Sequence, residues 1–205
     1  KLKAYLFNII MKTIEHFVSG RSFTGESKRT SKVFNPATGE QSSEVKLATS
    51  KDVNQAVESA KKAFESWAST PPLQRARIMF KFKELIEKNS DELTKIIVSE
   101  HGKVYDDAKG SLVRGLEVVE YACGIPQMLK GEFTENVGTN VDSWSIRQPL
   151  GVCAGITPFN FPAMVPMWMF PMAIACGNTF VLKPSEKDPS CSMRLAELLK
   201  EAGLP

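Results

Sequence analysis

The chain has 205 residues, of which 42% are hydrophobic and 24% are charged, and this composition excludes an intrinsically disordered protein. Lysine and arginine number 26 against 23 acidic residues, and the two signs are interspersed, so the sequence shows no basic patch for nucleic acid. The four cysteines form no CxxC pair and there are only two histidines. The sequence therefore predicts no metal site and no disulfide framework, and we expect a reducing, cytoplasmic compartment.

The two ends of the sequence have an unusual composition. Residues 1–10 contain a short apolar stretch without a following small-residue cleavage site, so an extension upstream of a natural start at Met11 explains them better than a signal peptide. At the other end, an amphipathic helix over residues 192–202 is followed by Gly203 and Pro205 as stop signals. This helix begins an α/β unit without the next strand, so we expect a truncated fragment.

The first half of the chain is predicted to be mainly helical. Two short extended runs within residues 33–48 surround the turn sequence NPATGE at residues 35–40. Residues 49–52 match a capping box, and the helix after them carries one apolar stripe up to Trp67. Three further helices are predicted, one after Pro71-Pro72, one from Ser90 to the His101-Gly102 stop, and one over about residues 105–128.

The second half has the β-α-β-α order of a doubly wound α/β sheet. Residues 131–139 are predicted as a turn-rich link, and the alternating residues 141–147 as an exposed or edge strand. The continuous apolar run at 151–156 is typical of a parallel strand buried on both faces. The remaining elements are predicted as a helix at residues 161–176, a strand at 178–182 and a helix from Pro189 onward.

A membrane span is the alternative for residues 148–182, which carry no charge. Five prolines interrupt this run, and Asn160 and Asn178 add polarity. We therefore favour a buried strand, turn, helix and strand, and no membrane association.

Two loops of this sheet would lie beyond the carboxyl ends of strands, where ligands bind in such folds. In the loop at 157–162, Asn160 stands between two aromatic residues and two prolines, and its carboxamide can donate to an oxyanion. The alternative is that Asn160 only forms the turn or caps a helix. In the loop after residue 182, Glu186 can accept hydrogen bonds from a ribose diol while Lys183 donates. The alternative is a solvated ion pair, and no GxGxxG or Walker motif supports a nucleotide.

Arg114 lies in the long helical stretch and can clamp a carboxylate, or it can be an exposed residue paired with Glu117. A group of methionines and aromatics can line a substrate tunnel, although most of it is predicted to be core. Its members are Met164, Met167, Trp168, Met169, Phe170 and Met172. The cysteines are also predicted to be core residues, since none has a nearby base in the sequence.

Two long motifs resemble the aldehyde dehydrogenase superfamily, namely PLGVCAGITPFNFP at residues 149–162 and GNTFVLKPSE at 177–186. The order of motifs from NPATGE onward fits the same superfamily across residues 13–205. Within it, Phe159 in place of the common tryptophan, RGLEVVE at 114–120 and MWMFPMA at 167–173 are similar to the CoA-acylating methylmalonate-semialdehyde dehydrogenases.

The resemblance implies an α/β fold with a helical N-terminal part, the first half of a doubly wound parallel NAD-binding sheet and a strand of an oligomerisation hairpin, truncated before the catalytic domain. Residues 1–10 would be an upstream extension and 11–130 the N-terminal part of the NAD-binding domain. Residues 131–149 would be the oligomerisation hairpin segment, and 150–205 the first half of the Rossmann-like core.

The resemblance also assigns roles to single residues. Asn160 matches the oxyanion-hole asparagine, and Arg114 matches an arginine that holds the substrate carboxylate. Glu186 matches a glutamate that holds the adenosine ribose of NAD and would repel a 2′-phosphate. The other cofactor-binding positions that the resemblance implies are Ile156, Thr157, Pro158, Phe159, Lys183 and Ser185.

The implied activity is oxidation of methylmalonate or malonate semialdehyde, a small-molecule aldehyde, to propionyl-CoA or acetyl-CoA, with NAD as cofactor and coenzyme A as co-substrate. The implied assembly is a homo-oligomer, either a dimer or a tetramer. In the family the nucleophilic cysteine lies far beyond residue 205, so we expect the fragment alone to be inactive. Two alternatives stay open: a hydrolytic NAD-dependent aldehyde dehydrogenase with another substrate, and a non-catalytic nucleotide-binding or assembly fragment.

Overall fold

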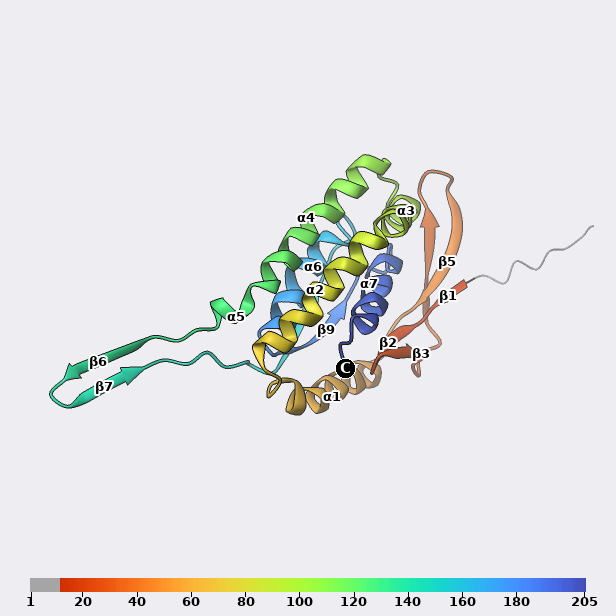
Figure 1. The fold of residues 1–205 in the computed structure, drawn as a ribbon. Helices are drawn as coiled ribbons and strands as arrows, with labels where there is room; N and C mark the ends of the chain where they lie inside the picture. Colours follow the sequence, from red (N-terminus) through yellow and green to blue (C-terminus); the bar gives the residue numbers. More distant parts are fainter. Residues whose placement is uncertain (1–11) are drawn as a thin grey trace, which may run out of the picture.

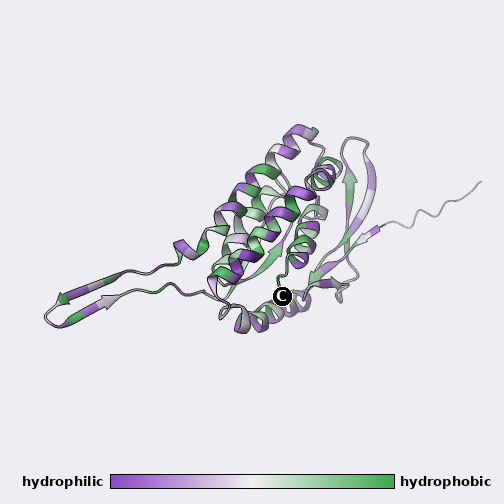
Figure 2. Cartoon of the chain, viewed as in Figure 1, coloured by the Kyte–Doolittle hydropathy of each residue, from purple (hydrophilic) through white to green (hydrophobic). Residues whose placement is uncertain are grey.

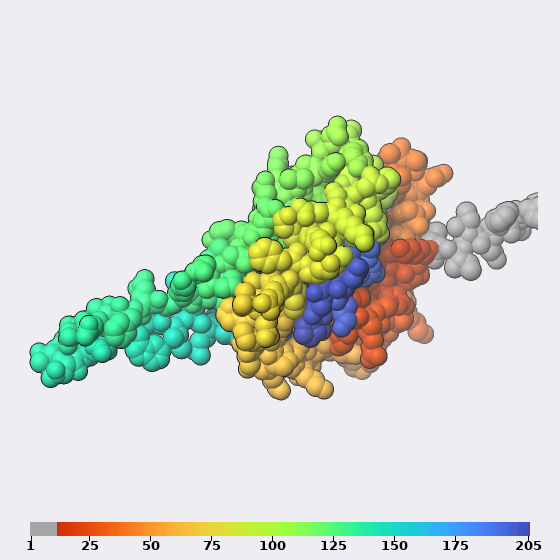
Figure 3. Space-filling model, in the orientation of Figure 1, coloured from red at the N-terminus to blue at the C-terminus, as the bar shows by residue number. Residues whose placement is uncertain are grey.

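The computed structural model describes residues 12–205 (Figure 1). The predicted extension at residues 1–10 and the start at Met11 lie outside the described residues. The described chain forms a helical body that covers a short parallel sheet, a small β region at the N-terminal side, and a long hairpin that extends away from the body (Figures 1 and 3).

The N-terminal β region contains the predicted hairpin. β4 (Thr30–Asn35) pairs antiparallel with β5 (Glu40–Lys46), and β1 (Lys12–Ile14) adds to β5 in parallel. The backbone N–H of Gly39 donates to the Asn35 carbonyl at 2.8 Å, which closes the predicted turn. β2 (His16–Val18) and β3 (Arg21–Phe23) form a separate two-stranded ribbon. None of β1, β2 and β3 was predicted, since each has only 3 residues and no clear alternation.

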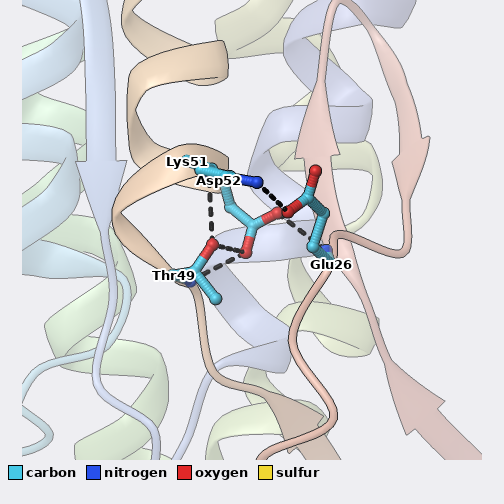
Figure 4. A network of polar contacts seen from close by, with 4 residues as sticks. All are labelled: Glu26, Thr49, Lys51 and Asp52. Atoms are coloured by element: carbon cyan, nitrogen blue, oxygen red, sulfur yellow. Dashed lines mark hydrogen bonds and ion pairs between the residues drawn. The ribbon is translucent and has the colours of Figure 1, made fainter.

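The predicted capping box begins α1 (Ser50–Trp67). The backbone N–H of Thr49 donates to Asp52 Oδ2 at 2.7 Å, and the backbone N–H of Asp52 donates to Thr49 Oγ1 at 3.2 Å. The other Asp52 oxygen accepts from the backbone N–H of Glu26 at 2.9 Å, and Lys51 pairs with the Glu26 carboxylate at 3.2 Å (Figure 4). The backbone and side chain of Thr49 are the main cause that lowers the pKa of Asp52 to about 2. The residues of the capping box therefore also connect the segment before β4 to the start of α1.

Three predicted helices of the body are confirmed as α2 (Pro72–Lys88), α3 (Ser90–His101) and α4 (Tyr105–Cys123). The prediction that the last one extends to residue 128 was wrong, because α4 ends at Cys123 and a short helix α5 (Ile125–Met128) follows Gly124. Pro126 explains the break: proline has no N–H for the carbonyl four residues earlier, and its ring clashes with that carbonyl.

β8 (Val152–Ile156), α6 (Met164–Ala175) and β9 (Thr179–Lys183) form the predicted β-α-β unit, and α7 (Ser190–Glu201) follows. β8 and β9 are parallel, with Val152 opposite Thr179 and Ile156 opposite Lys183. α1 and α6 both contact these strands, and α2 and α4 pack on α6. Figure 2 shows the hydrophobic strand β9 between α2 and α7, and the surfaces of these helices alternate between hydrophilic and hydrophobic residues.

A hydrophobic core joins six helices of the described residues, α2, α3, α4, α5, α6 and α7. Its largest fully buried side chains include Met79, Phe82, Ile86, Leu93, Ile97, Leu112, Met167, Leu195 and Leu198. α1 joins it through Trp67, whose indole N–H donates to the Ile174 carbonyl of α6 at 3.0 Å. No helix within residues 12–205 combines the length and apolar character that a membrane crossing needs.

The predicted burial of residues 151–156 on both faces was wrong for this chain. Val152, Ala154 and Ile156 are exposed, Ile156 to 78%, whereas Gly155 on the opposite side is buried against α6. Within residues 12–205 β8 pairs only with β9, and no element fully covers its outer side. The continuous apolar pattern shows that both faces of the strand are suited to burial. Whether a face is buried depends on which elements pack against it.

The hairpin differs in one strand from the sequence prediction. β6 (Phe133–Gly138) pairs antiparallel with β7 (Val141–Trp144), so residues 131–139 contain a strand and are not only a turn-rich link. The turn-forming residues are accommodated inside this strand by an irregularity of register between Thr134 and Gly138. Asn136 takes the left-handed conformation there, with φ +51°, and its backbone N–H donates to Asp142 Oδ1 at 2.9 Å.

Candidate functional site

The two predicted loops meet at one edge of the β8–β9 sheet. Ile156 and Lys183 are register partners at the carboxyl ends of the two strands. The backbone N–H of Thr157 donates to the Lys183 carbonyl at 3.1 Å, which joins the bases of both loops. This confirms the predicted common edge, and it places Asn160 and Glu186 on neighbouring loops at the position where ligands bind in α/β sheets.

The first loop presents the Asn160 side chain to solvent. Thr157 is buried at the base of the loop, whereas Pro158, Phe159 and Asn160 are exposed. Within residues 12–205 the Asn160 carboxamide has no hydrogen-bond partner, and α6, which begins at Met164 after the N-cap residue Ala163, has no side-chain cap. The capping interpretation of Asn160 is therefore not observed, and its amide group is free to donate to a ligand.

Lys183 is the last residue of β9 and not a loop residue as predicted, and it forms an ion pair with Glu186 of the second loop, with Lys183 Nζ 3.0 Å from Glu186 Oε2. Both side chains remain about half exposed, at 58% and 44%. A hydrogen bond from its own backbone amide, followed by the bond from Lys183, lowers the pKa of Glu186. Ser185 is buried, and its Oγ accepts from the backbone N–H of Lys187 at 3.1 Å. An ionised, accessible carboxylate next to an ammonium is compatible with both predicted interpretations, namely a binding site for a diol and a surface ion pair without a ligand.

Residues that the sequence analysis did not single out surround the first loop. Lys103 Nζ lies 3.7 Å from the ring centroid of Phe161, and Lys187 Nζ lies 4.5 Å from that of Phe159. The His101 ring also lies next to Phe159, with the two ring centroids 6.5 Å apart. These side chains come from the end of α3, from the segment between α3 and α4 and from the loop after β9, so no local spacing indicates them.

Two carboxyl groups near the second loop are shielded from solvent, Glu100 partly and Asp188 almost completely. Glu100 of α3 accepts from the backbone N–H of Ser190 at 3.0 Å and from its hydroxyl at 2.6 Å, while burial raises its pKa. Asp188 is 2% exposed, and both its carboxylate oxygens lack a partner among the described residues. Burial, reinforced by the charge of Glu100 and opposed by that of Lys103, raises the pKa of Asp188 to about 8. Neither carboxyl was singled out from the sequence, because nothing in its local pattern shows burial.

Arg114 is exposed on α4. Its positive charge contributes to lowering the pKa of Lys103, so the two cations lie near each other. The predicted alternative, an ion pair with Glu117, is not present among the described residues. The structure thus brings Arg114 toward the side of the site that Lys103 occupies, without a direct contact with Asn160.

The cysteines and methionines fit the core interpretation in most cases. Burial raises the pKa of the thiols of Cys123, Cys176 and Cys191, which disfavours the thiolate form that a nucleophile needs. Met164, Met167 and Phe170 are buried, whereas Trp168 and Met169 are partly exposed on α6, at 48% and 37%. Within residues 12–205, no group of three or more His, Cys, Asp or Glu side chains is arranged to hold a metal ion.

The chain is similar to known proteins along nearly its whole length. It is 54% identical over 195 residues to the malonate-semialdehyde dehydrogenase of Pseudomonas aeruginosa, covering 95% of this chain and 39% of that protein. It is 53% identical over 192 residues to the acylating, mitochondrial methylmalonate-semialdehyde dehydrogenase of Arabidopsis thaliana, covering 94% of this chain and 32% of that protein. The chain thus spans less than half the length of these relatives.

Solved structures show the same similarity. A protein assigned as a methylmalonate-semialdehyde dehydrogenase from Sinorhizobium meliloti 1021, in complex with NAD, is 57% identical, with a TM-score of 0.93 over 95% of this chain and 40% of that one. The methylmalonate-semialdehyde dehydrogenase of Oceanimonas doudoroffii is 59% identical, with a TM-score of 0.93 over the same shares. The profile of the Aldehyde dehydrogenase family matches residues 23–205. The resemblance in motifs, the common sheet edge and these matches lead to one conclusion: the chain belongs to the aldehyde dehydrogenase family.

Proposed function

We propose that this chain supplies the NAD-binding half-sheet and an oxyanion donor of a CoA-acylating semialdehyde dehydrogenase. The full-length enzyme would convert methylmalonate semialdehyde to propionyl-CoA with release of CO₂, and malonate semialdehyde to acetyl-CoA in the same way. The observation that carries the proposal is the meeting of the Asn160 loop and the Lys183–Glu186 loop at one sheet edge. The names of the most similar relatives support the substrate class.

The residues present fit NAD. The half-exposed Glu186 carboxylate, with its lowered pKa, can accept hydrogen bonds from both ribose hydroxyls while Lys183 donates to the same sugar. Its negative charge disfavours a 2′-phosphate and therefore NADP. Ser185 shapes this loop, and Ile156, Thr157, Pro158 and Phe159 form the wall on the nicotinamide side. When bound, NAD accepts the hydride that leaves the aldehyde carbon.

Asn160 and Arg114 would act on the substrate. The free carboxamide of Asn160 donates to the oxygen that gains negative charge when a thiolate adds to the aldehyde. The guanidinium of Arg114 would hold the substrate carboxylate through two parallel hydrogen bonds. The raised thiol pKa values of Cys123, Cys176 and Cys191 disfavour these three residues as the nucleophile. Cys153 lies inside β8, and none of the four cysteines matches the nucleophile position that the resemblance implies, so we propose that the nucleophile comes from outside these 205 residues and that the chain alone is inactive.

The test uses the full-length protein, methylmalonate semialdehyde and NAD, with and without CoA. NADH formation that needs CoA, together with propionyl-CoA in the product, supports the proposal. Formation of NADH at the full rate without CoA would instead identify a hydrolytic dehydrogenase. The 205-residue chain assayed alone is the matched control, and robust NADH formation by it would refute the proposed need for a thiol outside the chain.

We propose further that the β6–β7 hairpin mediates assembly of a homodimer or homotetramer. It extends away from the body (Figure 3), and it exposes large apolar side chains on a two-stranded ribbon. These side chains include Phe133, Val137, Val141 and Trp144, with Ile146 just after β7. Light scattering of the full-length protein should give a dimer or tetramer, and the double variant Val141→Asp and Trp144→Asp should lower the mass of the assembly.

The four free cysteines support a reducing, cytoplasmic location, which fractionation of the source cells would test.

A further inference from the structure

We propose that Lys103 is a positioning residue, whose ammonium group holds the Asn160 loop in place by contact with the Phe161 ring. This inference rests on the proposed function, because it concerns how the proposed oxyanion donor is oriented. It adds a residue from the segment between α3 and α4 to the two loops of the site.

The contact between Lys103 and Phe161 reaches the neighbour of the oxyanion donor. Lys103 Nζ stands 3.7 Å from the ring centroid of Phe161, which follows Asn160 directly in the chain. A cation at this distance over an aromatic face is attracted by the ring quadrupole, more strongly where solvent is partly excluded. Lys103 is only partly exposed, and burial is the main cause that lowers its pKa. Burial thus costs the ammonium part of its hydration, and attraction to the Phe161 ring offsets part of that cost.

The backbone fixes both ends of the contact. Lys103 follows Gly102, which ends α3 in the left-handed conformation with φ +82°, and the Gly102 N–H donates to the Val98 carbonyl at 3.0 Å. At the other end, the Phe161 carbonyl accepts from the backbone N–H of Val165 at 3.2 Å, in the first turn of α6. The ring is thus attached to α6 while the cation is attached to α3, and Asn160 lies in the exposed turn next to it.

Two carboxyl groups act on the charge of Lys103. Asp107 favours the ammonium form, and Asp188 adds to this only above its own pKa of about 8. Asp188 is 2% exposed and its oxygens have no partner among the described residues, whereas the neighbouring Glu100 accepts hydrogen bonds from Ser190. At neutral pH the contact with Phe161 is therefore the interaction that joins Lys103 to the Asn160 loop.

The geometry has a catalytic consequence. An oxyanion donor acts only when its N–H lies at hydrogen-bond distance from the position where the charge develops, and a displacement of about 1 Å can cost on the order of a hundredfold in rate. Removal of the Lys103 charge would let the Phe161 ring and the adjacent Asn160 move. Binding of NAD through Glu186 would change little, because that ion pair does not involve Lys103.

The experiment compares Lys103→Met, Lys103→Arg and the control Lys95→Met in the full-length protein. Lys95 is an exposed residue of α3 that pairs with Asp91. We expect Lys103→Met to lower kcat about tenfold with an unchanged Kd for NAD, and Lys103→Arg, which keeps a cation over the ring, to recover most of the rate. Lys95→Met should match wild type. A kcat of Lys103→Met within twofold of wild type, or an arginine variant as impaired as the methionine variant, would overturn the proposal.

Hydrogen exchange provides a measurement that does not depend on activity. Mass spectrometry of backbone amide exchange should show faster exchange over residues 157–165 in Lys103→Met than in wild type and Lys103→Arg, with α4 unchanged. Phe161→Leu, which removes the ring, should show the same local increase. Unchanged exchange in both variants would refute the positioning role even if the wild-type protein were active. Conversely, a wild-type protein without dehydrogenase activity would refute the proposed function, while the exchange result would still decide the role of Lys103.

Discussion

Gly115 of α4 lies directly against Met164 of α6, so that a Cβ at position 115 would stand 3.1 Å from the Met164 Cα. The neighbouring atom belongs to the backbone and cannot rotate away. This close approach explains how α4 and α6 pack against each other at the core of the described chain, next to the loop that carries Asn160.

Gly115→Ala should destabilise the protein by about 1–3 kcal/mol, because the added methyl group forces the two helices apart. Gly110 offers a matched control in the same helix, since a Cβ there meets nothing within 4 Å. Gly110→Ala should stabilise the protein by about 0.5–1 kcal/mol through helix propensity alone. Urea denaturation of both variants measures the difference, and equal free energies of unfolding would contradict the close approach of α4 and α6.

Asn160→Ala should lower kcat of the full-length enzyme by about a hundredfold to a thousandfold, which is the usual effect of removing one oxyanion donor. The Kd for NAD should stay the same, because the carboxamide would act on the reacting aldehyde. Steady-state kinetics and a fluorescence titration with NADH separate the two quantities. An equal loss in NAD affinity would place Asn160 in the cofactor site and not in the oxyanion hole.

Glu186→Gln should weaken NAD binding about tenfold or more, because a neutral amide replaces the charged acceptor of the two ribose hydroxyls. The same change removes the repulsion of a 2′-phosphate, so the ratio of NADP to NAD affinity should rise. Calorimetric titration with both nucleotides measures this ratio. Glu197→Gln is the control, since Glu197 forms an exposed ion pair with Arg194 on α7, and an equal effect there would contradict the assignment.

Asp188 should make the stability of the protein depend on pH. Its pKa is about 8 in the folded chain against the ordinary value of 3.8, so between these values the folded chain holds a proton that the unfolded chain has lost. The free energy of unfolding should therefore fall as pH rises from about 4 to about 8, by at most about 1.4 kcal/mol per pH unit from this group, and the contribution should level off above 8.

Asp188→Asn tests this dependence, because asparagine keeps the shape and cannot ionise. The variant should gain stability relative to wild type as pH rises, with Glu100, Lys103 and Glu186 as the charged neighbours that set the size of the effect. Thermal unfolding of both proteins from pH 5 to pH 9 measures the difference. Parallel curves over this range would show that Asp188 is ionised in the folded chain.

The sequence predicted several elements well, where local signals agreed with one another. The capping box at Thr49 and Asp52, the left-handed stop at Gly102 and the β-α-β unit around α6 all formed as expected. Errors arose where one local signal competed with another. Pro126 ended α4 in spite of the continuing apolar pattern, and the turn residues of β6 concealed a strand that its partner β7 stabilises.

In the candidate site too, some features were predicted from the sequence and others are visible only in the tertiary structure. By itself, the sequence determined that Asn160 and Glu186 follow parallel strands and that Lys183 lies at the end of one, and its motifs indicated the family. These features depend on residues close together in the chain. Only the tertiary structure decided that Lys103 lies over Phe161, that Asp188 is buried without a partner and that Gly115 meets Met164. These relationships join residues far apart in the chain, and they depend on how helices pack and which groups lose water, which no periodicity in the sequence encodes.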